Sequence, residues 1–213
     1  MKPLKGIYQH FSPDGMVTAD ERWQAVPLRA GGVQVDNETV RVAPFDEPRS
    51  DSMTVVLDAR LQLVELTIHG LFARREARIR PSEDQPDKLI VCWRFRGEVN
   101  ELVLPSGEST WFDWNTPLLT MVALWRLKLG VNQSYQLRIY ALDAVTFQPQ
   151  ALTRTFHRLA DEARETRFGA QTLAHYQAQD ENGARTDIWC NADGLIFEQR
   201  TPTVSYILTA ANL

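Results

Sequence analysis

The stretch NTPLLTMVALWRLKLG, residues 115–130, decides the fold. Either of its first two residues can cap a helix that starts at Pro117, and Gly130 can end it. Apolar side chains fall on every side of this predicted helix, which covers 117–129. A helix that is apolar all round cannot lie on a surface with one face towards water, so it must be buried. A buried strand over 118–127 is the alternative, because short apolar runs are ambiguous.

Short segments with alternating apolar and polar residues fill most of the remaining chain. Turn dipeptides separate these segments, which is the pattern of antiparallel strands. The predicted strands are Gly6–Phe11, Glu21–Leu28, Val33–Val42, Ser52–Leu57, Leu61–His69, Phe72–Arg80, Lys88–Arg96, Glu98–Leu104, Ser134–Ala141, Ala151–Leu159, Glu165–Gly169, Thr172–Gln179, Ala184–Cys190, Leu195–Gln199 and Thr203–Thr209. We therefore predict a single, mainly β domain over 1–213, an antiparallel curved sheet or half-open β-barrel wrapped around one buried apolar helix.

The dipeptide Gly70-Leu71 is typical of a two-residue type II′ hairpin. That turn would pair Leu66 with Arg75 and would place Arg75 on the apolar face, between small alanines. An unpaired buried charge is costly, so Arg75 needs a partner. The partner is either an anionic ligand group, held by two parallel hydrogen bonds, or an internal acid; a position at the edge of the sheet is the third possibility.

Two further dipeptides, Asn182-Gly183 and Asp193-Gly194, are typical of type I′ hairpin turns. Together they predict a three-stranded meander over 172–199. Opposite aromatic and charged side chains support this register. The predicted pairs are Tyr176 with Trp189, Asp180 with Arg185, and Asp187 with Arg200.

The same register places His175 opposite Cys190. A cysteine and a histidine in contact can act as nucleophile and base. Apolar neighbours on that face, and the lack of a third orienting residue nearby, favour a packed thiol and a hydrogen-bonded imidazole instead. We therefore count His175 among the candidate ligand contacts, and we predict no catalytic residue.

Three aromatic residues in Trp111-Phe112-Asp113-Trp114 come directly before the helix. They form either a plug for one end of the barrel or the lip of an apolar pocket. A ligand that lies along the helix would also come within reach of the indoles of Trp125 and Trp93. The candidate ligand-binding residues are Arg75, Trp93, Trp111, Trp114, Trp125 and His175.

Composition excludes several classes of protein. The 213 residues carry a formal net charge of −4, so the chain has no overall basic field for nucleic acid. Two cysteines and four scattered histidines show neither disulfide nor metal-ligand spacing, and no phosphate loop or hydrolase motif occurs, so we expect no metal and no cofactor.

The N-terminal stretch has no apolar core of a secretory signal, and no apolar run is long enough to span a membrane. We expect a soluble, cytoplasmic protein without a transmembrane segment, unless a leader was removed. The oligomeric state stays open.

Three motifs carry a resemblance to a known family. They are Thr116-Pro117-Leu118-Leu119, Leu124-Trp125-Arg126-Leu127-Lys128-Leu129-Gly130 and Thr186-Asp187-Ile188-Trp189-Cys190-Asn191-Ala192-Asp193-Gly194-Leu195. In these motifs, which lie in the C-terminal half, the chain resembles the bacterial glycolipid-binding proteins and related domains of unknown function. The resemblance implies a half-barrel similar to the periplasmic lipoprotein carriers, a hydrophobic ligand site on its concave side and no known catalysis. Those carriers have a secretory signal, which this chain does not show.

The leading hypothesis is non-enzymatic binding of an apolar or amphipathic small molecule, such as an anionic lipid or glycolipid, between sheet and helix. The alternatives are a protein-interaction or structural module with a fully packed interior, and an enzyme that uses Cys190 and His175. A cavity of about 300 Å³ or more beside Arg75 or Trp125 would favour the first hypothesis.

Overall fold

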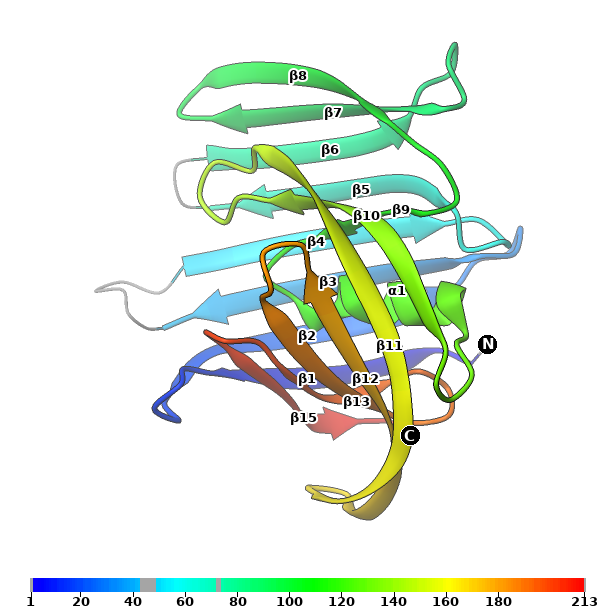
Figure 1. The fold of residues 1–213 in the computed structure, drawn as a ribbon. Coiled ribbons are helices and arrows are strands. Elements are labelled where there is room, and N and C mark those ends of the chain that lie inside the picture. The colour runs from blue at the N-terminus through cyan, green and yellow to red at the C-terminus, as the bar shows by residue number, and fades with distance from the viewer. Residues whose placement is uncertain (1, 43–48, 72–73, 213) are drawn as a thin grey trace.

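The computed structural model describes residues 2–42, 49–71 and 74–212. In these residues fifteen strands form one sheet and one helix lies inside its curve (Figure 1). The order of strands is β8-β7-β6-β5-β4-β3-β2-β1-β15-β14-β13-β12-β11-β10-β9. Neighbouring strands are antiparallel, except that β9 and β10 are parallel. The predicted fold class, one curved sheet around one apolar helix, is confirmed.

The sheet has two arms that meet where β1 pairs with β15. The first arm is a simple meander of eight strands. Its strands are β1 Leu4–Phe11, β2 Val17–Pro27, β3 Val33–Arg41, β4 Arg49–Leu57, β5 Leu63–Gly70, β6 Arg75–Pro81, β7 Lys88–Phe95 and β8 Glu98–Pro105. The strands of the second arm are β9 Thr110–Asp113, β10 Ser134–Leu142, β11 Pro149–Thr166, β12 Gly169–Asp180, β13 Arg185–Cys190, β14 Ile196–Arg200 and β15 Ser205–Ala211.

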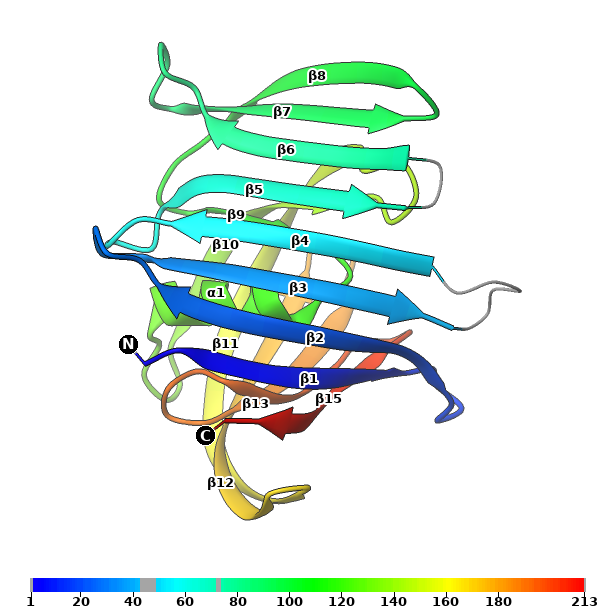
Figure 2. The ribbon, with the colours of Figure 1, turned by 180° about the vertical axis from the view of Figure 1, so that it is seen from behind.

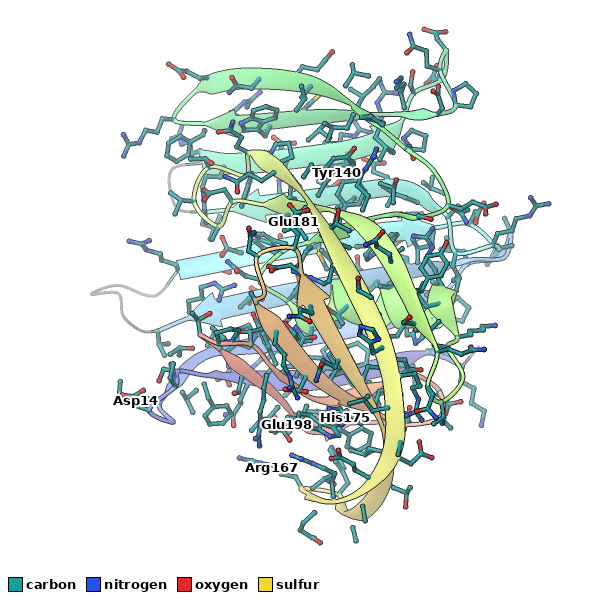
Figure 3. All side chains as sticks on the ribbon, in the orientation of Figure 1. Asp14, Tyr140, Arg167, His175, Glu181 and Glu198 are labelled. Carbon is teal, nitrogen blue, oxygen red and sulfur yellow. The ribbon has the colours of Figure 1, made fainter. Side chains whose placement is uncertain are left out.

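The second arm curls across the concave side of the first, with the helix α1 between them (Figures 1 and 2). Alternate side chains of the first arm point into this space, as in β4, where Met53, Val55 and Leu57 are buried. Tyr140 of β10, labelled in Figure 3, donates a hydrogen bond to the carbonyl oxygen of Pro105 at 2.8 Å. This bond ties the second arm to the end of β8.

Helix α1 covers Pro117–Leu127, and its first eight residues are all buried. Burial on every side follows from the apolar sequence, since the helix has no polar face for water. Thr116 caps the N-terminus, where its side-chain oxygen accepts a hydrogen bond from the backbone N–H of Leu118 at 3.1 Å. No helix in the described ranges is long and apolar enough to cross a bilayer.

The helix ends two residues earlier than the predicted 117–129. Lys128 takes a left-handed conformation with φ 44°, and its N–H donates to the carbonyl oxygen of Leu124. The lysine therefore closes the helix in the position that the sequence analysis gave to Gly130.

The hairpin between β5 and β6 has a longer connection than predicted. Gly70 pairs with Arg75 and Leu66 with Ile79, so the pairing of Leu66 with Arg75 is wrong by four residues. An even shift keeps each side chain on its face of the sheet, so Arg75 is still on the concave face and is buried. Residues 72–73 of the predicted strand Phe72–Arg80 lie outside the described residues.

The hairpin between β12 and β13 has a three-residue loop that ends at Gly183, whose φ is +85°. Such a loop, closed by a glycine in the left-handed region, replaces the two-residue turn that the same dipeptide also favours. The extra residue moves the register by one position. Tyr176 now pairs with Ile188, and Gln179 with Arg185, so two of the three predicted pairs are wrong.

The same shift separates His175 from Cys190. His175 pairs with Trp189, and Cys190 pairs with Ala174. The third predicted pair, Asp187 with Arg200, is confirmed, because a bulge between Trp189 and Cys190 compensates for the second three-residue loop.

Two strands differ from the sequence analysis. The predicted strand Ala151–Leu159 and the first two residues of the predicted strand Glu165–Gly169 belong to the long strand β11, which continues through a bulge between Arg158 and Asp161. The rest of Glu165–Gly169 forms the turn into β12, which begins at Gly169. The strand β9 was not predicted, because three of its four residues belong to the aromatic stretch and show no alternation.

Candidate functional site

A groove of about 450 Å³ lies at the C-terminal end of α1. Its lining is of mixed polarity, and the apolar side chains come from three parts of the fold. The helix contributes Trp125 and Leu127, strand β10 contributes Leu137, and the connection between β4 and β5 contributes Leu61.

The rim of this groove is polar and mainly basic. Arg60, Arg126 and Lys128 contribute positive charges, and Glu108 contributes a negative one. A lining that combines apolar side chains with basic ones suits a molecule with an apolar part and an anionic group.

A second, smaller hollow of about 300 Å³ adjoins the groove. Both share three lining residues, Gln62, Glu108 and Arg126. The smaller hollow has apolar walls from Leu89 and Trp111. Arg126 therefore stands between two partly apolar spaces.

The side chain of Arg126 is half-buried and is held by neutral oxygen atoms. Its guanidinium donates to the carbonyl oxygens of Thr110 at 3.1 Å and Glu108 at 2.9 Å, and to Oε1 of Gln62 at 3.4 Å. It also stacks over the Trp111 ring, 4.8 Å from the centroid. Burial lowers the pKa of Arg126, which still carries its positive charge at neutral pH.

Trp125 forms one wall of the groove and lies against the turn that follows β13. A Cβ atom at Gly194 would come within 2.7 Å of Cδ1 of Trp125, and Gly194 has a φ of +77°. The position of this indole thus depends on a glycine, both for space and for backbone conformation. Nε1 of Trp125 is buried and has no hydrogen-bond partner among the described residues.

The other end of the helix, where the chain enters it, is closed. Arg75 is buried there, and its Nη2 lies 2.7 Å from Oδ1 of Asp51. Arg75 also donates to the carbonyl oxygen of Val145 at 3.1 Å and lies over the Phe147 ring at 4.7 Å. The pair needs Gly70 beside it, because a Cβ there would lie 2.7 Å from Nη2 of Arg75.

Trp114 completes this closed end. It is buried and packs edge-on against Phe147, with the ring centroids 5.8 Å apart. Trp111 is also buried, and its Nε1 donates to the carbonyl oxygen of Leu119 at 2.7 Å. Of the two predicted roles for the aromatic stretch, Trp114 matches the plug, whereas Trp111 lines the smaller hollow.

His175 lies on the second arm of the sheet (Figure 3). Its Nδ1 is 2.7 Å from Oε1 of Glu162, its Nε2 is 3.1 Å from Oδ1 of Asp187, and its ring stacks on Trp189. Cys190 is buried, and burial raises the pKa of its thiol to about 12. A thiol with so high a pKa is a poor nucleophile at neutral pH.

The structure thus brings Trp111 and Trp125 to the two hollows, and it places Arg75, Trp93, Trp114 and His175 outside their linings. Trp93 is half-buried on β7 and packs against the core. Sequence reasoning missed the basic residues of the groove. One signal could have revealed Arg126, because it is the single charged residue within the helix.

The described residues contain no group of three or more His, Cys, Asp or Glu side chains that could hold a metal ion.

No family model matches the sequence, and no curated protein matches it. Several solved structures match the fold. A β-barrel-like protein of the domain of unknown function DUF1849 from Brucella abortus is 12% identical, with a TM-score of 0.67, over 100% of this chain and 98% of that one. A DUF1089 family protein from Pseudomonas aeruginosa is 16% identical, with a TM-score of 0.47, over 91% of this chain and 89% of that one. The first likeness shows that the chain has the architecture of a barrel-like protein of unknown function.

Proposed function

We propose that the protein binds an amphipathic small molecule without transforming it, in the groove at the C-terminal end of α1. The observation that carries this proposal is the groove itself, about 450 Å³ in volume and walled by Trp125, Leu127 and Leu137. This volume falls within the range of about 300–1,000 Å³ that is usual for small-molecule sites. A groove beside Trp125 is also the feature that favours binding over a fully packed interior.

The chemistry of the lining fits this role. Apolar side chains at the base can hold a hydrocarbon chain, and Arg60, Arg126 and Lys128 can hold a polar or anionic group at the rim. A glycolipid, which the resemblance of the sequence motifs implies, is one member of this ligand class. No turnover is part of the proposal, since Cys190 and His175 do not form a pair in the register of β12 and β13.

Native mass spectrometry of the purified protein, together with lipid extraction, tests whether a small molecule is bound. We expect a mass above that of the chain, which organic extraction removes. The bound compound should then be displaced by a fluorescent amphiphile such as 1-anilinonaphthalene-8-sulfonate.

A blocking variant locates the site. Ala59 is exposed and lines the groove, so Ala59→Trp should fill its mouth and weaken probe binding. Ala170 is also exposed but lies in the hairpin between β11 and β12, so Ala170→Trp is the matched control. Equal probe binding by both variants and the unmodified protein would exclude this groove as the site.

A second candidate function, a protein-interaction module, is supported by the edge strand β8. Seven of its eight residues are exposed, among them Val99, Leu102 and Val103. An extended segment of a partner could pair with this edge through backbone hydrogen bonds. Selective protection of β8 amides from hydrogen exchange on partner addition would support this candidate.

A further inference from the structure

Arg126 occupies a position in which a cation lacks an acidic partner. Within the described ranges, no carboxylate oxygen forms an ion pair with it, and its hydrogen-bond acceptors are two backbone carbonyls and one amide oxygen. A guanidinium has five N–H donors, and these contacts occupy three of them. The longest contact, to Gln62, is 3.4 Å and is the weakest of the three.

The site therefore holds a positive charge in place but does not neutralise it. Thr110, Glu108 and the Trp111 ring fix the plane of the guanidinium from the protein side. The carboxylate of Glu108 and that of Asp58 influence Arg126 only from a distance. Arg60 and Lys128, on the same rim, leave the groove with an excess of positive charge.

Apolar surface adjoins this charge. On one side lie Trp125 and Leu127, and on the other side lies Leu89. An oxyanion at Arg126 can thus be continued by a hydrocarbon chain into the larger groove. A free inorganic anion would leave that apolar surface unused.

We infer that Arg126 recognises the oxyanion of a single-chain anionic amphiphile, a carboxylate, sulfate or phosphate monoester, whose chain lies along Trp125 and Leu127. This inference rests on the proposed function, because it requires the groove to be a binding site. The bound oxyanion takes the place of Gln62 on the guanidinium and accepts two hydrogen bonds from it. Arg126, and not the buried Arg75, is then the residue that selects the ligand by charge.

The test compares dodecanoate with dodecanol, which share an alkyl chain but differ in charge. Calorimetry at neutral pH measures both with the unmodified protein, with Arg126→Met and with Arg126→Lys. We expect Arg126→Met to weaken dodecanoate by roughly 10- to 100-fold, the range for a charged hydrogen bond, and to change dodecanol by less than about threefold. Arg126→Lys keeps the charge without the planar fork, so its effect on dodecanoate should be intermediate.

Arg94→Met is the matched control, because Arg94 is exposed on β7 and lines neither hollow. Circular dichroism of each variant shows that the sheet is intact. Inorganic phosphate alone should bind at least about 100-fold more weakly than dodecanoate, since it gains nothing from the apolar wall.

The outcomes separate the two proposals. Equal weakening of dodecanoate and dodecanol by Arg126→Met, or no weakening of either, would overturn the role of Arg126 and leave the binding groove standing. Tight binding of inorganic phosphate would show a site for a free anion and would overturn the inference that the ligand is an amphiphile. No binding of dodecanoate or dodecanol to the unmodified protein would overturn both proposals.

Discussion

An arginine lies at each end of α1, and the two have similar surroundings. Arg75 lies over Phe147 and donates to carbonyl oxygens of the loop after β10. Arg126 lies over Trp111 and donates to carbonyl oxygens at the start of β9 and just before it. The difference is the carboxylate of Asp51, which is 2.7 Å from Arg75 and has no counterpart at Arg126 in the part of the chain that the structure describes.

This difference gives the two arginines different roles: the charge of Arg75 stabilises the fold, and the charge of Arg126 is available to a ligand. With its acid supplied by the protein, Arg75 is buried and the space around it is filled. Arg126 has an aromatic surface and neutral acceptors but no acid, and two hollows open beside it. An arginine at one end of α1 is therefore part of the packed core, whereas the arginine at the other end can contact a ligand.

The largest expected effect comes from removing the carboxylate at the closed end. Asp51→Ala removes a buried carboxylate that pairs with both Arg75 and Arg41, so the free energy of unfolding should fall by about 3–5 kcal/mol. Arg126→Met at the open end removes hydrogen bonds to neutral acceptors only, and should cost about 1–2 kcal/mol. Urea denaturation measures both.

The double variant Asp51→Ala/Arg75→Met is the control for this comparison. It removes both charges and should recover part of the loss. If Asp51→Ala and Arg126→Met lower the stability equally, the distinction between the two ends does not hold.

A smaller effect is expected from glycine substitutions in two related hairpins. Gly183 and Gly194 both have positive φ, 85° and 77°, but only Gly194 would direct a Cβ against Trp125. Gly183→Ala should cost about 1–2 kcal/mol for the left-handed backbone. Gly194→Ala should cost more and should shift tryptophan emission, because it displaces the indole that walls the groove. Unchanged emission and equal losses of stability would show that Trp125 does not depend on this turn.

The smallest expected effect is on the stability of the protein at acidic pH. Asp143 begins the loop that presents a carbonyl oxygen to Arg75, and hydrogen bonds from Thr146 and Val145 hold its pKa below the usual 3.8. Its contribution is therefore present above pH 3.8 and is lost as the pH falls through the lower pKa of the folded state. The loss should stay below about 1 kcal/mol, because the group is exposed.

Asp143→Asn should flatten this part of the stability profile, as measured by thermal unfolding between neutral pH and pH 3 or so. Arg126→Met, at the other end, should keep the slope of the unmodified protein. A profile that is unchanged by Asp143→Asn would mean that other carboxylates determine the acid dependence.

Periodicity predicted the faces of the sheet better than the pairing of its strands. The apolar stretch before Gly130 predicted the helix, and the alternation of apolar and polar residues predicted which side chains of β4 and β6 lie on the concave face. Registers depend on loop length, and a dipeptide such as Asn182-Gly183 fits a two-residue turn and a three-residue loop equally well. One residue of difference was enough to replace Cys190 by Trp189 opposite His175.

The site was less predictable than the fold. The sequence indicated that Arg75 needs a partner and left open whether a ligand anion or an internal acid supplies it. The acid is on β4, 24 residues away, and only the order of strands brings it close. The groove is built from loop residues such as Arg60 and Glu108, whose approach to Arg126 no local pattern encodes. The charged residue inside the apolar helix was the one local signal.

The pairing of β1 with β15 has a consequence for how the protein is made. The N–H of Lys5 and the side chain of Asn212, 207 positions apart, form a hydrogen bond across this seam. A ribosome has to deliver the residues up to β15 before β1 meets its second neighbour, so β1 remains an unprotected edge until β15 has been made. The loop that closes this seam is among the longest the chain can form, so we expect joining of the two arms to be a late and slow step of folding.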